Sequence, residues 1–124
     1  MRDESKRTGP YAGYDSLEDA VQGLRRARFR VVSTFRVERR GLVVEGDILE
    51  GTASVGMVLL PVLEAHENIY TPLTIESVEF VLHEGGTEKV ALVVSTPLGD
   101  VKPLLVPGTI VDVLERSPGG LTRA

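Results

Sequence analysis

Residues 35–57 read FRVERRGLVVEGDILEGTASVGM, and this stretch decides the fold that the sequence predicts. Glycines recur in it at a regular step, at Gly41, Gly46, Gly51 and Gly56. The residues between the first three glycines are mostly aliphatic or β-branched, which suits pleated, half-buried strands. A glycine inside such a run marks a bulge, a sharp bend or a place where another backbone comes close. We therefore interpret the stretch as the corner strands of a small β-barrel.

Further strands are predicted on both sides of this stretch, because apolar residues alternate there with polar ones. In the first of these strands Phe29 and Phe35 share one phase, which places both side chains in the core. The fourth strand changes phase after Ile75, so we predict a bulge near Glu76 and Ser77. The expected strands cover residues 29–37, 42–49, 57–63, 73–82, 89–95 and 109–114.

A short helix is predicted ahead of the first strand. Ser16 is a good N-cap, and Asp19 follows three residues later. An apolar stripe at helical spacing comes next, formed by Leu17, Ala20, Val21 and Leu24. We expect this helix to pack on the barrel. The predicted organisation is a flexible N-terminal tail over residues 1–14, the helix and barrel over 15–115, and a disordered C-terminal tail over 116–124.

Four blocks of the sequence resemble the second domain of translational GTPases such as elongation factor Tu. The blocks, in the order in which the family has them, are RRGLVVEGDILEG (39–51), LTIESVEF (73–80), EKVALVV (88–94) and VPGTIVDVL (106–114). The positions that match the family's RGTVVTGRVERG and VxVGD motifs are Arg40, Gly41, Val43, Val44, Gly46, Gly51, Val55 and Gly56. The resemblance implies an all-β fold, a six-stranded closed Greek-key β-barrel, here with a short N-terminal helix.

The same resemblance implies a surface pocket, which in elongation factor Tu holds the aminoacylated end of transfer RNA. The family's phenylalanine falls on Phe35 and its glutamate on Glu79. Its acidic pair falls on Val32 and Ser33, and its arginine falls on Leu82. Polar recognition fails when its partners are replaced by apolar groups. These differences argue against capture of aminoacyl-transfer RNA.

Charge is distributed unevenly along the chain. Residues 1–40 hold ten Lys and Arg against six Asp and Glu, residues 41–124 hold four against twelve, and the net charge is −4. A strand would place Arg28, Arg30 and Arg36 on one side, where they could contact phosphate. The alternatives are a solvated outer face and a basic arm that lies on its own acidic barrel. The predicted binding residues are Arg28, Arg30, Phe35, Arg36, Arg39, Arg40 and Glu79.

Several enzymatic motifs do not occur in this sequence. It has no Walker-type GxxxxGK[ST] loop for a nucleoside triphosphate, no cysteine, and no serine in a GxSxG elbow. Glu45 and Asp47 share one side of a predicted strand and could perturb each other as an acid–base pair. The alternative is the polar outer face that a barrel strand normally presents to water. We therefore do not expect an enzyme.

The two histidines give one further hypothesis. His66 and His83 each have a glutamate beside them, Glu67 and Glu84. Two histidines and a carboxylate can hold a transition metal when loops distant in sequence meet. The alternative is that both histidines are solvated loop residues, and we predict no cofactor.

We predict a non-catalytic binding module of the translation-factor barrel type, without GTPase activity of its own. The expected partner is RNA or the ribosome, contacted through the arginine-bearing face. The alternative is a protein-interaction or structural module that binds another protein and no RNA. No membrane contact is expected, because the N-terminus has no apolar signal and no apolar run approaches the ~20 residues that span a bilayer. The expected location is cytoplasmic.

Overall fold

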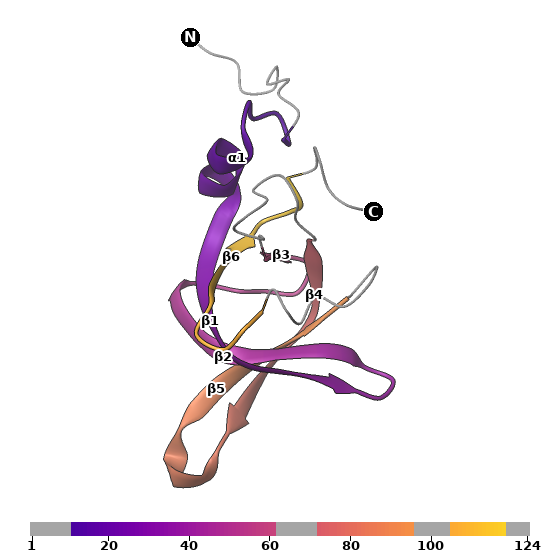
Figure 1. The fold of residues 1–124 in the computed structure, drawn as a ribbon, viewed down its shortest axis with the longest axis vertical. Coiled ribbons are helices and arrows are strands. Elements are labelled where there is room, and N and C mark those ends of the chain that lie inside the picture. The colour runs from indigo at the N-terminus through magenta and orange to yellow at the C-terminus, as the bar shows by residue number, and fades with distance from the viewer. Residues whose placement is uncertain (1–10, 62–71, 96–104, 119–124) are drawn as a thin grey trace.

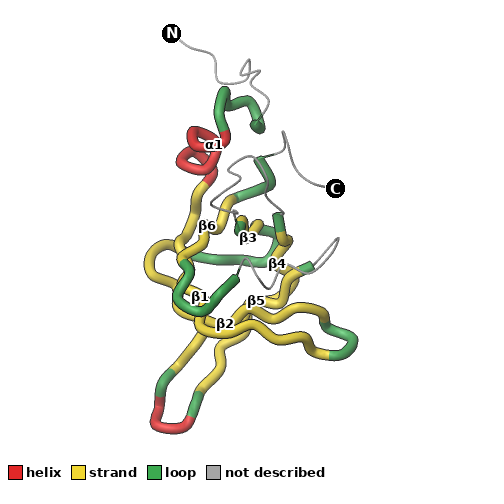
Figure 2. Tube along the Cα trace, in the orientation of Figure 1, coloured by secondary structure: helices red, strands yellow, loops and turns green. Residues whose placement is uncertain are grey.

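The computed structural model describes residues 11–61, 72–95 and 105–118. In these ranges the chain forms one short helix and six strands, which Figure 1 and Figure 2 show in the same orientation. The elements are α1 (Leu17–Leu24), β1 (Arg25–Val37), β2 (Gly41–Gly51), β3 (Val58–Leu60), β4 (Leu73–Leu82), a 3-10 turn η2 (Glu84–Gly86), β5 (Glu88–Val94) and β6 (Ile110–Leu114). Residues 1–10 and 119–124 of the predicted tails, and His66 with Glu67, lie outside the described residues.

The six strands form a closed barrel in the order β1-β2-β5-β4-β3-β6, and β6 pairs back onto β1. Every neighbouring pair is antiparallel. Strands β3, β4 and β5 follow one another as a meander, and β2 lies beside β5 instead of β3, which is the Greek-key arrangement. The predicted all-β, six-stranded Greek-key barrel with a short N-terminal helix is confirmed.

The core is built from alternate residues of the strands. On β2, Leu42 and Val44 point inward, and on β5 Leu92 and Val94 do the same. Phe29 of β1 is fully buried among them and is the only aromatic side chain in this core cluster of the described residues. Burial of these apolar side chains, at roughly 25 cal/mol per Å² removed from water, is the main stabilising contribution to the barrel.

Two glycines allow β1 and β2 to come into close contact, as the glycine spacing predicts. A Cβ on Gly46 would lie 1.9 Å from the carbonyl oxygen of Arg30 and 2.9 Å from the ring of Phe29. A Cβ on Gly51 would lie 2.0 Å from the carbonyl oxygen of Arg26, and Gly51 also has a φ of +78°. Only glycine fits both positions, so these two residues are the points at which β2 bends around β1.

Bulges change which side chains of β1 and β4 face the core. The predicted bulge of β4 is confirmed, because its pairing with β5 shifts between Ile75 and Ser77. On β1 the pairing with β2 shifts between Val31 and Ser33, so that Phe35 pairs with Val43 on the outer face of the sheet. The prediction that Phe35 lies in the core is therefore wrong, and its side chain is 40% exposed.

Helix α1 begins at a side-chain cap and packs on the barrel, as predicted. Ser16 is the N-cap, and its Oγ accepts a hydrogen bond from the backbone N–H of Asp19 at 3.1 Å. Ala20 and Leu24 are buried against Leu60 of β3 and Leu114 of β6. Residues 11–14 pack against the same cluster and form a short antiparallel bridge. The helix thus closes one end of the barrel.

Two hairpins continue beyond the closed part of the barrel (Figure 1). β1 pairs with β6 only as far as Arg30, while its pairing with β2 continues to Val37. β4 pairs with β3 only at Leu73 and Thr74, while its pairing with β5 continues to Leu82. The β1–β2 hairpin and the β4–β5 hairpin therefore project beyond the closed ring, while β2 and β5 stay paired with each other from Leu42–Val94 to Gly46–Val90.

Replacing Gly46 by alanine tests the close contact between β1 and β2. The new methyl group would meet the Arg30 carbonyl oxygen and the Phe29 ring, so β2 must move away from β1. We expect Gly46→Ala to lower the free energy of unfolding by about 3 kcal/mol or more. Denaturant unfolding of the purified protein measures this loss.

The matched control is Gly56→Ala. Gly56 has open space around a Cβ but a φ of +93°, so its substitution adds backbone strain of about 1 kcal/mol without a clash. Equal losses in the two variants would contradict the close-contact explanation.

Candidate nucleic-acid interface

The first feature of the candidate interface is a carboxylate on β6 that lies between two arginines of β1. Val111 and Val113 point into the core, so Asp112 points outward. Its Oδ1 atom lies 3.5 Å from Nη1 of Arg25 and 4.0 Å from Nε of Arg28. The second distance is too long for a hydrogen bond, and among the described residues the Nε atom of Arg28 has no hydrogen-bond partner.

A second shared carboxylate lies just after the end of β6. Glu115 Oε1 accepts a hydrogen bond from Nη2 of Arg26 at 3.0 Å, and Glu115 Oε2 accepts one from Nη1 of Arg116 at 2.7 Å. The backbone N–H of Glu115 donates to the carbonyl oxygen of Leu24 at 2.8 Å, which fixes this residue beside the end of α1. The Glu115 carboxylate therefore joins the start of β1 to the residues that follow β6.

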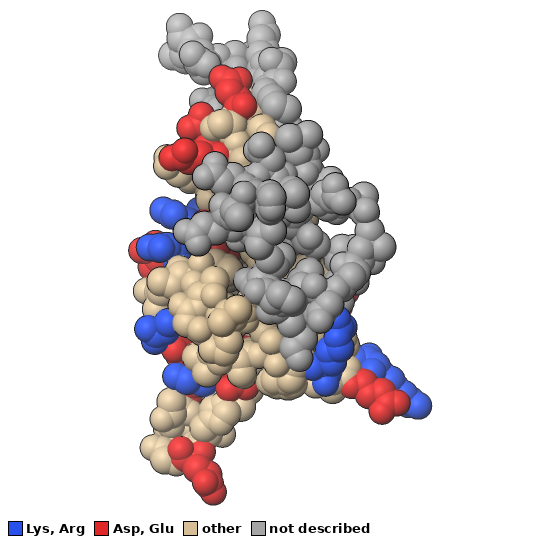
Figure 3. Space-filling view, in the orientation of Figure 1, with Lys and Arg blue, Asp and Glu red and all other residues tan. Residues whose placement is uncertain are grey.

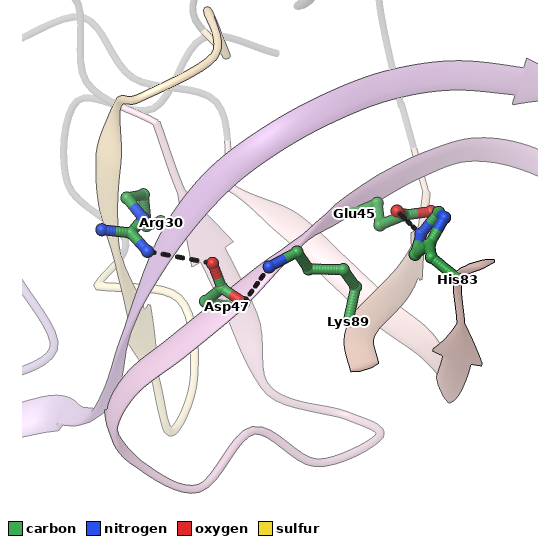
Figure 4. Close-up of polar contacts among 5 residues, drawn as sticks. All are labelled: Arg30, Glu45, Asp47, His83 and Lys89. Atoms are coloured by element: carbon green, nitrogen blue, oxygen red, sulfur yellow. Dashed lines mark hydrogen bonds and ion pairs between the residues drawn. The ribbon is translucent and has the colours of Figure 1, made fainter. Parts of the chain in front are cut away.

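The third shared carboxylate is Asp47 on β2 (Figure 4). Its Oδ2 atom accepts a hydrogen bond from Nη2 of Arg30 at 3.0 Å, and its Oδ1 atom accepts one from Nζ of Lys89 at 3.0 Å. The hydrogen bond from Lys89, followed by that from Arg30, holds the pKa of Asp47 below its ordinary value. Asp47 is therefore ionised at neutral pH and bound to two cations from different strands.

Six cations thus share three carboxylates, which leaves this group with a net charge of +3. We call it the cationic face, and it consists of Arg25, Arg26, Arg28, Arg30, Lys89 and Arg116 with Asp47, Asp112 and Glu115. The arginine side chains are 38% to 58% exposed although they are paired. Figure 3 shows blue side chains in a column along the edge of the molecule that carries β1, with red groups between them.

A shallow hollow of about 230 Å³ opens at one end of the cationic face. It is lined by Arg25, Arg26 and Ala27 of β1 and by Glu50 and Gly51 of β2. Glu50 lies opposite Arg28 in the β1–β2 ladder and brings one further negative charge to this end.

The predicted arginine stripe is only partly correct. Arg28 and Arg30 lie together on the cationic face. Arg36 does not join them, because the bulge between Val31 and Ser33 moves it to the side of the hairpin that also carries the buried Leu42. The prediction that Arg28, Arg30 and Arg36 share one side is therefore wrong. Arg39 lies in the turn at the tip of the β1–β2 hairpin, with a φ of +70°.

Four cations of the cationic face were not among the predicted binding residues. Arg25 and Arg26 precede the predicted strand but belong to β1, which starts at Arg25. Lys89 and Arg116 join the face only through the strand register and the path of the chain after β6. The run of arginines at residues 25–30 was the signal that could have identified Arg25 and Arg26. The sequence holds no local signal for Lys89 and Arg116.

Phe35 and Glu79, two other predicted binding residues, lie on a different surface, the outer face of the projecting sheet. Phe35 of β1 pairs there with Val43 of β2, which in turn pairs with Val93 of β5. Glu79 lies on β4, the strand next to β5. Val43, Ala91 and Val93 form a small buried cluster on this face. The structure therefore brings Phe35 and Glu79 to the same face, apart from Arg28 and Arg30.

Arg40 binds the carboxylate of Glu79 with both terminal nitrogens, which joins the turn of one hairpin to the strand of the other. This contact, together with the hydroxyl of Ser77, holds the pKa of Glu79 below its ordinary value and raises that of Arg40. Glu79 is thus already engaged by a cation of its own chain. Leu82, at the family's arginine position, is exposed at the end of β4.

Glu45 and Asp47 lie on the same strand, but each contacts a different partner (Figure 4). Glu45 is only 7% exposed, and its Oε1 atom lies 2.5 Å from Nε2 of His83. Asp47 is bound to Arg30 and Lys89 instead. His83 therefore gives the buried carboxylate of Glu45 a hydrogen-bond partner.

No group of three His, Cys, Asp or Glu side chains within residues 11–61, 72–95 and 105–118 is arranged to hold a metal ion. The hypothesis that used His66 and Glu67 concerns residues outside these ranges. In the same part of the chain, no helix has the length and apolar character needed to cross a membrane.

Comparison with known proteins returns no match, either to a protein-family model or to a curated protein. The relationship to the second domain of translational GTPases thus stays a prediction based on four short blocks. The assignment of a function has to rest on the surfaces described above.

The pH dependence of stability tests the ion pairs of Asp47. The pKa of Asp47 is lower in the folded chain than in the unfolded chain, where it is about 3.9. Its contribution to stability is therefore present above that pH and is lost as the pH falls through the folded-state pKa. We expect Asp47→Asn to reduce the free energy of unfolding at pH 7 by about 1 kcal/mol or less, since partly hydrated ion pairs are screened.

The measurement is urea unfolding of the wild type and of Asp47→Asn at a series of pH values. The difference between the two proteins should shrink steadily below about pH 4. Glu50→Gln, on the same strand, is the control and should change stability little at any pH. A difference that stays constant down to strongly acidic pH would contradict the role given to these ion pairs.

Proposed function

We propose that this chain is a non-catalytic RNA-binding module of the translation-factor barrel type, and that its cationic face holds the RNA backbone. The observation that carries the proposal is the sharing of three carboxylates by six cations across β6, β1 and β2. A carboxylate between two cations fixes both in place and neutralises only half of their charge. The face is therefore preformed and keeps positive charge for phosphate groups.

The shape of the cationic face favours a polyanion over a small anion. Its cations follow the length of β1 from Arg25 to Arg30 and continue to Lys89 on β5, instead of converging on one point. Neither phenylalanine of β1 joins the face, since Phe29 lies in the core and Phe35 on the other surface. Tyr11 and Tyr14 pack on the cluster around α1, and Phe80 lies on β4. Contacts of this kind reach phosphates and not bases, so binding is expected to be independent of RNA sequence.

The remaining parts of the proposal come from the sequence. The four blocks that resemble the second domain of translational GTPases support a role with RNA or the ribosome in the cytoplasm. The missing Walker loop supports a chain without GTPase activity of its own. The alternative is a protein-interaction or structural module that binds no RNA.

Titration with a fluorescently labelled oligouridine, followed by anisotropy at several salt concentrations, tests this function. We expect binding at low salt that weakens steeply as salt is added. In the triple variant Arg25→Gln, Arg28→Gln and Arg30→Gln, the log–log salt slope should become shallower by about 0.7 for each lost phosphate contact, or about 2 in total. Thermal unfolding of the variant checks that the barrel is retained.

The matched control removes two arginines from the projecting hairpin, as Arg36→Gln with Arg39→Gln. This variant should bind oligouridine as the wild type does, because neither residue belongs to the cationic face. Absence of binding at low salt would refute the RNA proposal and favour the alternative. An equal loss per arginine in the two variants would show that net charge, and not the cationic face, is responsible.

A further inference from the structure

The outer edge of β4 lacks a neighbouring strand over most of its length. β5 occupies one edge of β4, and β3 occupies the other only at Leu73 and Thr74. The backbone of Ile75 makes the last contacts on that side, with Gly56 and Met57. From Glu76 to Leu82, no described residue hydrogen-bonds to this edge. In an antiparallel sheet every second residue of such an edge presents its N–H and C=O groups for pairing.

The same segment carries an exposed apolar stripe. Val78 is packed against the core, and Phe80 and Leu82 continue its face of the hairpin outward. Phe80 is 69% exposed and Leu82 is 72% exposed, the two largest exposed fractions among the large apolar side chains of the described residues. Natural proteins usually protect a free edge with charged residues. This edge instead presents an aromatic and an aliphatic side chain beside its free backbone groups.

Acidic side chains border the stripe. Glu88 lies directly opposite Leu82 in the β4–β5 ladder, Glu84 lies in the turn at the tip, and Glu76 lies where the free edge begins. All three are exposed, and Figure 3 shows acidic groups at the tip of this projecting hairpin. Lys89 lies in the opposite phase of β5, where it is bound to Asp47. The face that carries Phe80 and Leu82 therefore favours a positively charged partner.

We propose that the free edge of β4 binds an extended segment of a partner protein in which apolar residues alternate with lysine or arginine. The segment would add a strand beside β4, through backbone hydrogen bonds from Glu76 to Leu82. Its apolar side chains would cover Phe80 and Leu82. Its cations would project from the other face of the added strand, within reach of Glu76 and Glu84 at the two ends of the edge. This surface is separate from the cationic face and does not depend on the RNA proposal.

A second copy of this chain is a poorer occupant of the edge. If two β4 edges paired antiparallel with Phe80 opposite Phe80, Glu76 of each copy would approach the turn of the other copy's hairpin, which carries Glu84. Like charges held close together are destabilising. The acidic border thus selects a basic partner over self-association.

Three synthetic peptides test the proposal against the full chain. The first is a capped peptide of alternating valine and lysine, the second has glutamate in place of lysine, and the third is the valine–lysine peptide with every second backbone nitrogen methylated. We expect the first peptide to bind, as measured by fluorescence anisotropy, and the other two to bind at least about tenfold more weakly. Hydrogen exchange should slow at the edge-facing amides of residues 76–82 only with the first peptide.

Variants of the chain locate the binding surface. The double substitution Phe80→Ser with Leu82→Ser changes exposed side chains and should weaken binding of the valine–lysine peptide roughly tenfold or more. Val55→Ser removes another exposed apolar side chain, in the turn before β3, and should leave binding unchanged. The double variant should keep the wild-type affinity for oligouridine if the chain binds RNA.

Four results would overturn the proposal. No binding of the valine–lysine peptide, or equal binding of the methylated peptide, would exclude strand addition. Equal binding of the acidic peptide would exclude selection by the glutamates. Self-association of the wild type in sedimentation, abolished by Phe80→Ser with Leu82→Ser, would assign the edge to a second copy.

Discussion

The contact between the backbones of β1 and β2 at Gly46 is the constraint on which the rest of the structure depends. No side-chain atom can occupy the space between Gly46 and the Arg30 carbonyl oxygen, so β2 passes directly over β1 and over the ring of Phe29. This contact closes the core around its only aromatic side chain within the described residues. It also sets the register that places Asp47 opposite Arg30. One glycine therefore connects the packing of the core with one of the three shared carboxylates on the surface.

Bulges show why the sequence predicts some features of this barrel and misses others. The bulge of β4 is visible in the sequence, because its apolar residues change phase after Ile75. The bulge of β1 leaves no such trace, since Phe29, Val31 and Phe35 keep one phase along the sequence. In the structure the extra residue turns Phe35 outward, where Val43 of the small outer cluster lies opposite it in the ladder. The outer face has an apolar cluster of its own, so an apolar residue is also suited to that face. The alternation of apolar residues along β1 therefore does not reveal the bulge.

The candidate site was less predictable than the fold for a related reason. Strand existence and type depend on local pattern, but ion pairs depend on register and on chain segments far apart. Arg26 and Glu115 are separated by 89 positions, and Arg30 meets Asp47 only because the β1–β2 pairing shifts between Val31 and Ser33. The sequence pointed correctly to an arginine-rich first strand. It could not indicate that carboxylates from β2 and β6 each lie between two of the cations.

The uneven charge of the sequence becomes an uneven charge in space. Most cations of residues 1–40 that the structure describes lie on or near β1, whereas the β4–β5 hairpin carries glutamates at its base, its tip and beside Leu82. A polyanion drawn toward β1 would be repelled by that hairpin, and a basic peptide drawn toward the hairpin would be repelled by β1. The cationic face and the end of the β4–β5 hairpin therefore carry charge of opposite sign. The cationic part of β1 lies in the closed ring, whereas the free edge of β4 lies beyond it on the projecting hairpin. This separation allows a small barrel to present two surfaces of opposite charge.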